Sequence, residues 1–283
     1  MFRIICLIFV QRQLRNIMHY SIFIGLISFI FYSTTDGNEK TARSSKYKMV
    51  WSDEFDQGTR PDPRKWNYET GYIRNKELQY YTEDRSENAR IENGMLVIET
   101  RNDNYEGNPI TSASLHTSGL QDFKYGKIEV RAKLPIGKGM WPAIWMLGNN
   151  KKEVGWPACG EIDIMENVGF DPDVIHANVH TKAYNHVKGT NKGDKIIVSS
   201  PSENFHVYAI EWDKEKIQFF VDKKKYFTFE NEGGGTEVWP FSQPHNLKIN
   251  AAFGGGWGGQ QGVDQSILPQ KFYVDYVRYY QKK

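Results

Sequence analysis

The chain has 283 residues, of which 39% are hydrophobic and 25% charged, a composition typical of a soluble globular protein and not of a disordered one. Its formal net charge is +2, but residues 1–34 contain three arginines and no acidic residue. Without that segment 33 basic residues stand against 34 acidic ones, so the charge does not indicate a nucleic-acid partner.

The N-terminal segment is predicted to be an export signal. Residues 20–32 (YSIFIGLISFIFY) form an apolar run that is short for a membrane span and follows Arg12 and Arg15. We therefore predict a signal peptide or leader over residues 1–34 and a secreted protein. A membrane anchor is the alternative, because no A-x-A cleavage site follows the run. Residues 35–47 are small and polar, as in a linker, and residues 48–283 are predicted to form one domain.

From residue 49 onward the chain is a series of short strand patterns separated by turn residues. An Asn93-Gly94 pair predicts a tight turn before residues 95–100, and residues 213–216 predict the turn of a hairpin. Residues 127–134 (KIEVRAKL) alternate, with one apolar face made of Ile128, Val130, Ala132 and Leu134. Further strand patterns cover residues 206–212, 217–221, 227–229, 247–253 and 272–280. Because no amphipathic helix of three turns is evident, we predict an all-β fold, an antiparallel β-sandwich.

The most informative stretch is residues 160–166 (GEIDIME), which place three acids among apolar residues. On a helix the acids would point in scattered directions, whereas on a strand Glu161 and Asp163 share a face. Glu166 is five steps from Glu161 and therefore out of phase, and a one-residue bulge near Ile164 and Met165 would return it to the acidic face. The alternative interpretation is an ordinary strand with a solvated acidic edge.

The bulged arrangement suits a particular chemistry. Four strand steps of about 3.3 Å put the backbones of Glu161 and Glu166 about 13 Å apart. Side chains that lean inward by about 4 Å each would bring the two carboxyl groups to about 5 Å. That separation is typical of a retaining glycosidase, since an inverting enzyme needs about 6.5–9.5 Å. Asp163 between them would help to keep the two pKa values different.

Tryptophans surround this acidic stretch in the sequence. Trp141 and Trp145 lie in residues 141–148 (WPAIWMLG), Trp156 comes five residues before Glu161, and Trp257 lies in a glycine-rich segment, residues 254–259. Indole rings stack on the flat C–H faces of sugars, and a tryptophan flanked by glycines can stand clear of the backbone. Trp141 and Trp145 are equally compatible with a place in the core.

These motifs together resemble glycoside hydrolase family 16, and specifically its bacterial laminarinases. The similarity includes residues 51–55 (WSDEF), 75–82 (NKELQYYT), 125–135 (YGKIEVRAKLP) and 274–279 (VDYVRY). It implies a β-jelly-roll sandwich with a concave substrate cleft. It also implies that Glu161 is the nucleophile, Asp163 its assisting acid and Glu166 the acid/base. The resemblance makes Trp141, Trp145 and Trp257 candidate sugar platforms, with Asn75 and His180 as polar contacts; for His180, a structural role in the sheet is the alternative.

The resemblance also implies a structural calcium ion held by Glu54, the carbonyl of Gly94 and Asp275, for which a plain surface role of both acids is the alternative. One position departs from the family pattern, because Ser114 stands where many laminarinases have arginine. If that arginine binds sugar, this chain must use other contacts at that subsite. Cys159, the one cysteine beyond the leader, is expected to pack in the interior and not to act as a nucleophile.

We therefore predict a retaining endo-acting hydrolase of β-1,3-glucan that needs no cofactor for catalysis, and we expect a monomer with no membrane partner. A family member acting on mixed-linkage glucan or on a marine galactan is the first alternative. A non-catalytic β-glucan-binding protein is the second, and the presence of both Glu161 and Glu166 argues against it.

Overall fold

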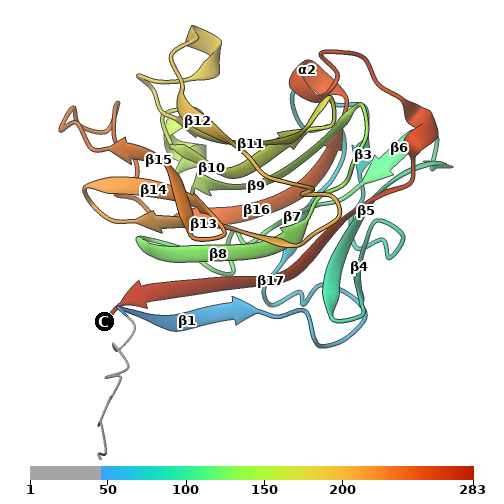
Figure 1. Ribbon diagram of the computed structural model, residues 1–283, viewed down its shortest axis with the longest axis horizontal. Helices are drawn as coiled ribbons and strands as arrows, with labels where there is room; N and C mark the ends of the chain where they lie inside the picture. Colours follow the sequence, from blue (N-terminus) through green and yellow to red (C-terminus); the bar gives the residue numbers. More distant parts are fainter. Residues whose placement is uncertain (1–45) are drawn as a thin grey trace, which may run out of the picture. The chain divides into compact units, whose positions relative to one another are not determined.

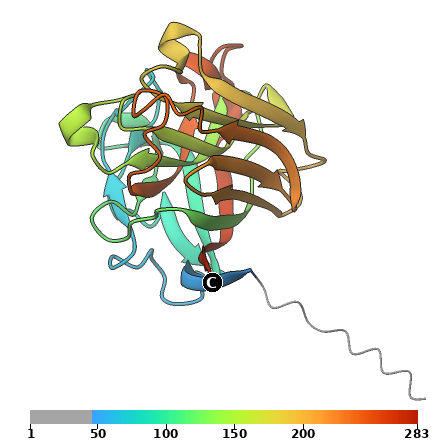
Figure 2. The same cartoon turned by 90° about the vertical axis from the view of Figure 1, so that its left-hand side faces the viewer.

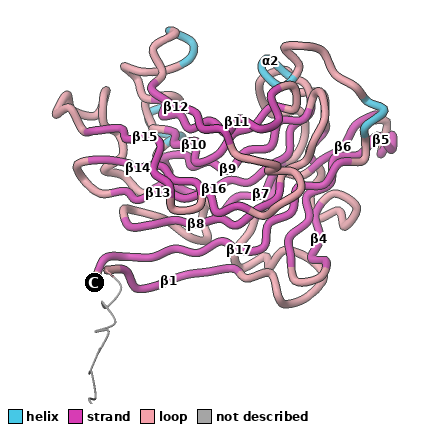
Figure 3. The backbone as a smooth tube through the Cα atoms, in the orientation of Figure 1, coloured by secondary structure: helices cyan, strands magenta, loops and turns pink. Residues whose placement is uncertain are grey.

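The computed structural model describes residues 46–283, so the predicted leader and most of the predicted linker lie outside the described residues. The first strand, β1, begins at Tyr47, so the last residue of the predicted linker belongs to the sheet. Within the described part of the chain no helix is both long and apolar enough to cross a membrane. Strands dominate the fold, and the few helices are single turns (Figure 3).

The strands form two sheets (Figure 1). One sheet has ten strands, with the path β15-β14-β13-β8-β17-β5-β6-β3, while β1 pairs with β17 and β4 with β5. Its members are β1 (Tyr47–Asp53), β3 (Tyr80–Tyr81), β4 (Ala89–Glu92), β5 (Met95–Tyr105), β6 (Asn108–Ser112), β8 (Gly126–Lys133), β13 (His206–Trp212), β14 (Lys216–Val221), β15 (Lys224–Glu230) and β17 (Gln270–Lys282).

The second sheet has seven strands in the order β12-β11-β10-β9-β16-β7-β2. They are β2 (Asn67–Glu69), β7 (Ser114–His116), β9 (Met140–Gly148), β10 (Glu161–Val168), β11 (Asp171–His180), β12 (Lys192–Ile197) and β16 (His245–Phe253). Single helical turns occur at α1 (Lys151–Val154), η1 (His186–Lys188), α2 (Gly255–Gly258) and η2 (Gln265–Ile267). The recorded strand pairs are antiparallel except for the short pair β3 and β6, which confirms the predicted sandwich class.

Several local predictions are confirmed. In β8 the alternate residues are buried, as the pattern of residues 127–134 requires. Asn93 and Gly94 both have positive φ, 55° and 73°, and join β4 to β5, with Glu92 opposite Met95. Two consecutive residues of positive φ make a type I′ turn, whose twist matches that of the flanking strands.

A continuous apolar core lies between the two sheets and includes residues of both. Strand β9 shows how this core positions the site. Its residues Ile144 and Met146 point into the core, while Ala143, Trp145 and Leu147 form a separate cluster with Cys159 on the opposite face of the strand. Strand β1 pairs with the C-terminal part of β17, whose other neighbours are β8 and β5, and the C-terminus lies next to β1 in both views (Figures 1 and 2).

Candidate active site

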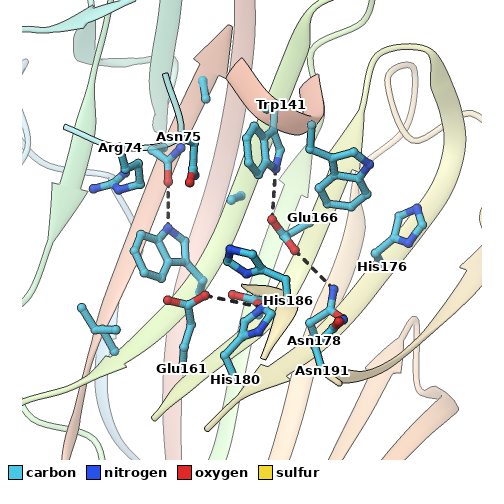
Figure 4. A pocket seen from close by; sticks show the side chains of 18 of the residues that line it. Arg74, Asn75, Trp141, Glu161, Glu166, His176, Asn178, His180, His186 and Asn191 are labelled. Atoms are coloured by element: carbon cyan, nitrogen blue, oxygen red, sulfur yellow. Dashed lines mark hydrogen bonds and ion pairs between the residues drawn. The ribbon is translucent and has the colours of Figure 1, made fainter. Parts of the chain in front are cut away.

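A cleft of about 760 Å³ lies on the face of the seven-stranded sheet that points away from the core (Figure 4). Side chains of four neighbouring strands, β9, β10, β11 and β16, form its floor. Its walls come from α2, from η1 and from the segments that precede β3, β10 and β12. Among the lining residues are all eight predicted catalytic and sugar-binding residues: Asn75, Trp141, Trp145, Glu161, Asp163, Glu166, His180 and Trp257.

The pairing register brings the three acids of β10 onto this floor. Glu161 lies between Leu147 of β9 and His180 of β11. Asp163 lies between Trp145 and Asn178 in the next row of the same three strands. These partners show that the acids share the face that carries Trp145, and not the face that carries Ile144 and Met146.

Glu166 reaches the same face through the predicted bulge. It pairs with Ala143, two residues before Trp145 on β9, although it lies three residues after Asp163 on β10. The register shift therefore falls between Asp163 and Glu166, and both residues of the bulge, Ile164 and Met165, are buried in the core. Five steps along a regular strand would place Glu161 and Glu166 on opposite faces, and the extra residue of the bulge in β10 returns both to the same face.

Two indole N–H groups hold the outer carboxylates. Trp156 donates to Oε2 of Glu161 and Trp141 donates to Oε1 of Glu166, each at 3.0 Å. Asn178 also donates to Oε2 of Glu166, at 3.5 Å. Asp163 is only 4% exposed and its Oδ2 accepts no hydrogen bond from the described residues; Nε2 of His180 lies 3.3 Å from it. Of the three acids, Asp163 therefore has the least stabilised charge.

The electrostatics follow from this burial. Loss of water raises the pKa of Glu161, Asp163 and Glu166, each to about 8. For both glutamates the charge of the neighbouring Asp163 contributes to this rise, because like charges repel at short distance. Near neutral pH the cluster therefore keeps part of its protons, so an ionised carboxylate and a carboxylic acid can be present in the cleft at the same time.

The three predicted tryptophan platforms differ in how much of the ring is exposed in the cleft. Trp141 and Trp257 are half-buried and meet edge to face at 5.6 Å, and Trp257 also meets His176 at 5.0 Å. Trp257 lies in the single helical turn α2 and not in an irregular loop. Trp145 is 8% exposed and its indole N–H donates to Asn250 at 2.8 Å, so it forms part of the floor and offers less ring surface than Trp141 or Trp257.

The two predicted polar contacts, Asn75 and His180, both line the cleft. Asn75 is exposed at the rim, where it donates to Oε1 of Glu77 at 3.2 Å. His180 is buried and lies against the acids, with Nε2 3.3 Å from Asp163 and 3.7 Å from Glu161, so its side chain contacts both carboxylates. Sequence reasoning left Trp156 and Asn178 unassigned; only the spacing of Trp156 before Glu161 gave a signal for either.

The comparisons with known proteins agree with this geometry. The family model for glycosyl hydrolases family 16 matches residues 76–278. The chain belongs to this family. A β-glucanase of Rhodothermus marinus is 48% identical over 277 residues, which cover 95% of this chain and 96% of the relative.

Solved family 16 structures are similar over most of the described residues. The laminarinase from Rhodothermus marinus superposes with a TM-score of 0.82 at 51% identity, over 84% of this chain and 98% of that one. A mutant of SCLam, a non-specific endo-β-1,3(4)-glucanase, co-crystallised with 1,3-β-D-cellotriosyl-glucose, gives a TM-score of 0.80 at 50% identity, over 84% of this chain and 96% of its own. These matches confirm the predicted family and its jelly-roll fold.

The residues proposed for calcium in this family 16 domain have other partners. Glu54 accepts two hydrogen bonds from Nε and one from Nη2 of Arg278, and this guanidinium holds the pKa of Glu54 below its usual value. Asp275 pairs with Arg131 at 2.5 Å. A guanidinium group already balances each carboxylate, so the donor set as placed does not fit an additional cation.

Cys159 behaves as predicted. It is free and buried beside Trp145 and Leu147, and burial raises the pKa of its thiol to about 11. A thiol that stays protonated at neutral pH is a packing group and not a nucleophile.

Proposed function

We propose that this protein is a retaining endo-β-1,3-glucanase in which Glu161 is the nucleophile, Glu166 the acid/base and Asp163 the assisting acid. The observation that carries the proposal is the β10 bulge, which brings these three acids onto one cleft floor between two indole N–H donors. Family membership and the β-glucanase and laminarinase relatives support the substrate class.

The proposed reaction is a double displacement. An ionised Glu161 attacks the anomeric carbon while Glu166 gives its proton to the departing glycosidic oxygen, so the carbon–oxygen bond breaks as a glycosyl ester forms. Glu166, now ionised, removes a proton from water, and the resulting hydroxide replaces Glu161 at the anomeric carbon. Each enzyme group ends in its starting state, and no cofactor takes part.

Asp163 has a definite part in this scheme. Because its Oδ2 accepts no hydrogen bond from the described residues and has only Nε2 of His180 nearby, it is the acid that most favours the protonated form. A neutral Asp163 reduces repulsion on Glu161, which therefore ionises more readily while Glu166 keeps its proton. When the glycosyl ester forms, Glu161 loses its negative charge, so it no longer repels a negative charge on Asp163 or Glu166.

Azide distinguishes the two glutamate roles. With Glu161→Ala, azide should take the place of the nucleophile and give the α-glycosyl azide. With Glu166→Ala, azide should attack the covalent intermediate and give the β-glycosyl azide. Both variants should fold and lose most hydrolysis of laminarin. The same anomer from both variants would refute the assignment of the two glutamates. If the unaltered protein hydrolyses neither laminarin nor lichenan, the proposed function is wrong.

A mixed-linkage specificity is the second candidate, because the similar enzyme SCLam is named as a non-specific endo-β-1,3(4)-glucanase. Initial rates on laminarin, lichenan, agarose and carrageenan decide between the candidates. Faster hydrolysis of laminarin than of lichenan supports the first, comparable rates support the second, and cleavage of either galactan contradicts both.

A structural calcium ion at Glu54, Gly94 and Asp275 remains a separate hypothesis from the family resemblance, and the arginine partners of both acids weigh against it. Thermal unfolding in EDTA and in millimolar calcium chloride tests it. A melting temperature that rises by several degrees with calcium, and fails to do so in Glu54→Gln, would support the ion; equal melting temperatures would exclude it.

We also propose that the protein is exported and acts as a monomer. The support for export is the apolar run at residues 20–32, and fusion of residues 1–34 to a reporter that folds only outside the cytoplasm tests it. Light scattering after size-exclusion chromatography tests the oligomeric state.

A further inference from the structure

The resemblance to laminarinases implies an arginine at position 114, where this chain has a serine. Ser114 begins β7, opposite Glu69 of β2 and Asn250 of β16. Its hydroxyl donates to Oε2 of Glu69 at 2.7 Å. The side chain is short and buried, so it cannot itself reach across the cleft to a sugar.

A different arginine reaches the same carboxylate. Nη2 of Arg74 donates to Oε2 of Glu69, the oxygen that also accepts from Ser114. Arg74 arrives from the segment between β2 and β3, and the next two residues, Asn75 and Lys76, both have positive φ, 56° and 55°. Two consecutive non-glycine residues in the left-handed region are uncommon and costly, and such strain concentrates at functional sites.

Arg74 is also the group of this cluster that faces the cleft. Its guanidinium carbon lies 5.1 Å from the centre of the Trp145 ring, and its side chain is 20% exposed and lines the cleft (Figure 4). Lys248 pairs with the other oxygen of Glu69 at 2.6 Å and also approaches Trp145, at 5.2 Å. Its side chain is only 8% exposed, however, and it does not line the cleft.

The guanidinium has hydrogen-bonding capacity that the protein does not use. An arginine carries five N–H donors, and among the described residues the acceptor recorded for Arg74 is Glu69 alone, with Nη1 buried and unpaired. Asn250 fixes the neighbouring indole by accepting its N–H, and Asn250 in turn donates to Tyr81 at 3.1 Å. The Arg74 guanidinium is therefore a charged donor beside the fixed indole of Trp145, and in a cleft proposed to bind polysaccharide it can donate a hydrogen bond to a sugar hydroxyl.

We propose that Arg74 forms the sugar-binding subsite at the Trp145 end of the cleft and replaces, from the segment before β3, the arginine that Ser114 does not provide from β7. The inference rests on the proposed glucanase function and concerns how many glucose units the cleft holds. Glu69 is then the positioning residue, because it fixes the guanidinium between β2 and β7.

Four variants test the subsite: Arg74→Ala, Arg74→Lys, Arg74→Ala with Ser114→Arg, and the control Lys76→Ala. Lys76 is exposed on the same segment and does not line the cleft. The measurement is kcat and KM on laminari-oligosaccharides of three to six units, with the melting temperature of each variant. Arg74→Ala should raise KM for the longer substrates about 10- to 100-fold, as expected for loss of a charge-assisted hydrogen bond, with kcat nearly unchanged.

Each added glucose unit should therefore increase kcat/KM by a smaller factor in Arg74→Ala than in the unaltered protein. In the double variant, Ser114→Arg should restore a large part of that increase. Arg74→Lys keeps the pair with Glu69 but loses the planar fork, so it should fold and still lose several-fold in KM. A chain-length profile equal to that of Lys76→Ala in both Arg74 variants would overturn the subsite. Failure of the unaltered protein to cleave any of the oligosaccharides would instead overturn the proposed function.

Discussion

The hydrogen bond from Trp156 to Glu161 gives the most direct test of the proposed roles. The indole N–H lies 3.0 Å from Oε2 of Glu161 and stabilises its ionised form, which opposes the rise in pKa that burial causes. Trp156→Phe removes this donor and keeps most of the ring. The pKa of Glu161 should therefore rise further, and a larger fraction of the nucleophile should be protonated at any pH below that value.

The size of the effect follows from the burial of the pair. The side chain of Glu161 is 16% exposed, so solvent cannot fully replace the lost donor. A hydrogen bond to a charged group contributes about 1.5–3 kcal/mol, and one pKa unit corresponds to about 1.4 kcal/mol. The acidic limb of kcat/KM should therefore move to higher pH by about one to two units.

Trp141→Phe is the matched control, because the indole N–H of Trp141 donates to Glu166 at the same distance, 3.0 Å. A higher pKa of Glu166 preserves the proton that the leaving group needs, so activity should persist to higher pH and the basic limb should move upward. The assay is kcat/KM on a laminari-oligosaccharide between pH 4 and 10, with folding checked at each pH. If both variants move the same limb, or if neither limb moves by 0.5 unit, the assignment of nucleophile and acid is wrong.

Three further changes test the site. Asp163→Asn should raise the melting temperature at pH 8 by at least about 2 °C. The pKa of Asp163 is raised to about 8 in the folded protein, so its carboxyl group lowers native stability as the pH rises from about 4 to 8. An amide does not ionise and therefore avoids this loss. Trp257→Ala should weaken laminari-oligosaccharide binding about tenfold by calorimetry while the melting temperature changes little, because the ring is half-buried at the cleft edge. One alanine inserted after Met165 should turn Glu166 toward the core and abolish laminarin turnover in a folded protein, whereas Met165→Leu keeps the residue count and should keep most activity.

Each of these three has a clear contrary result. A stability gain for Asp163→Asn that is the same at pH 5 as at pH 8 would mean that charge is not its cause. Collapse of the melting temperature in Trp257→Ala would make that residue part of the core. Near-native turnover by a folded insertion variant would show that strand parity does not place Glu166.

The sequence by itself determined the features that depend on neighbours in the chain. Alternation along residues 127–134 predicted the buried face of β8, and Asn93-Gly94 predicted the turn before β5, because each reflects local backbone geometry. The bulge in β10 was predictable for the same reason, since Glu161 and Glu166 are an odd number of steps apart and both must reach the cleft.

Only the tertiary structure decided which side chains meet across the sheets. Arg74 and Ser114 share one oxygen of Glu69, although 45 residues separate Ser114 from Glu69, and the pairing of Arg278 with Glu54 spans 224 residues. No local pattern encodes such contacts, because they follow from the order and register of strands that are distant in the chain. The burial that raises the pKa values of the three acids has the same origin: β9, β11 and the tryptophans beside them exclude water from carboxylates that β10 alone would leave exposed.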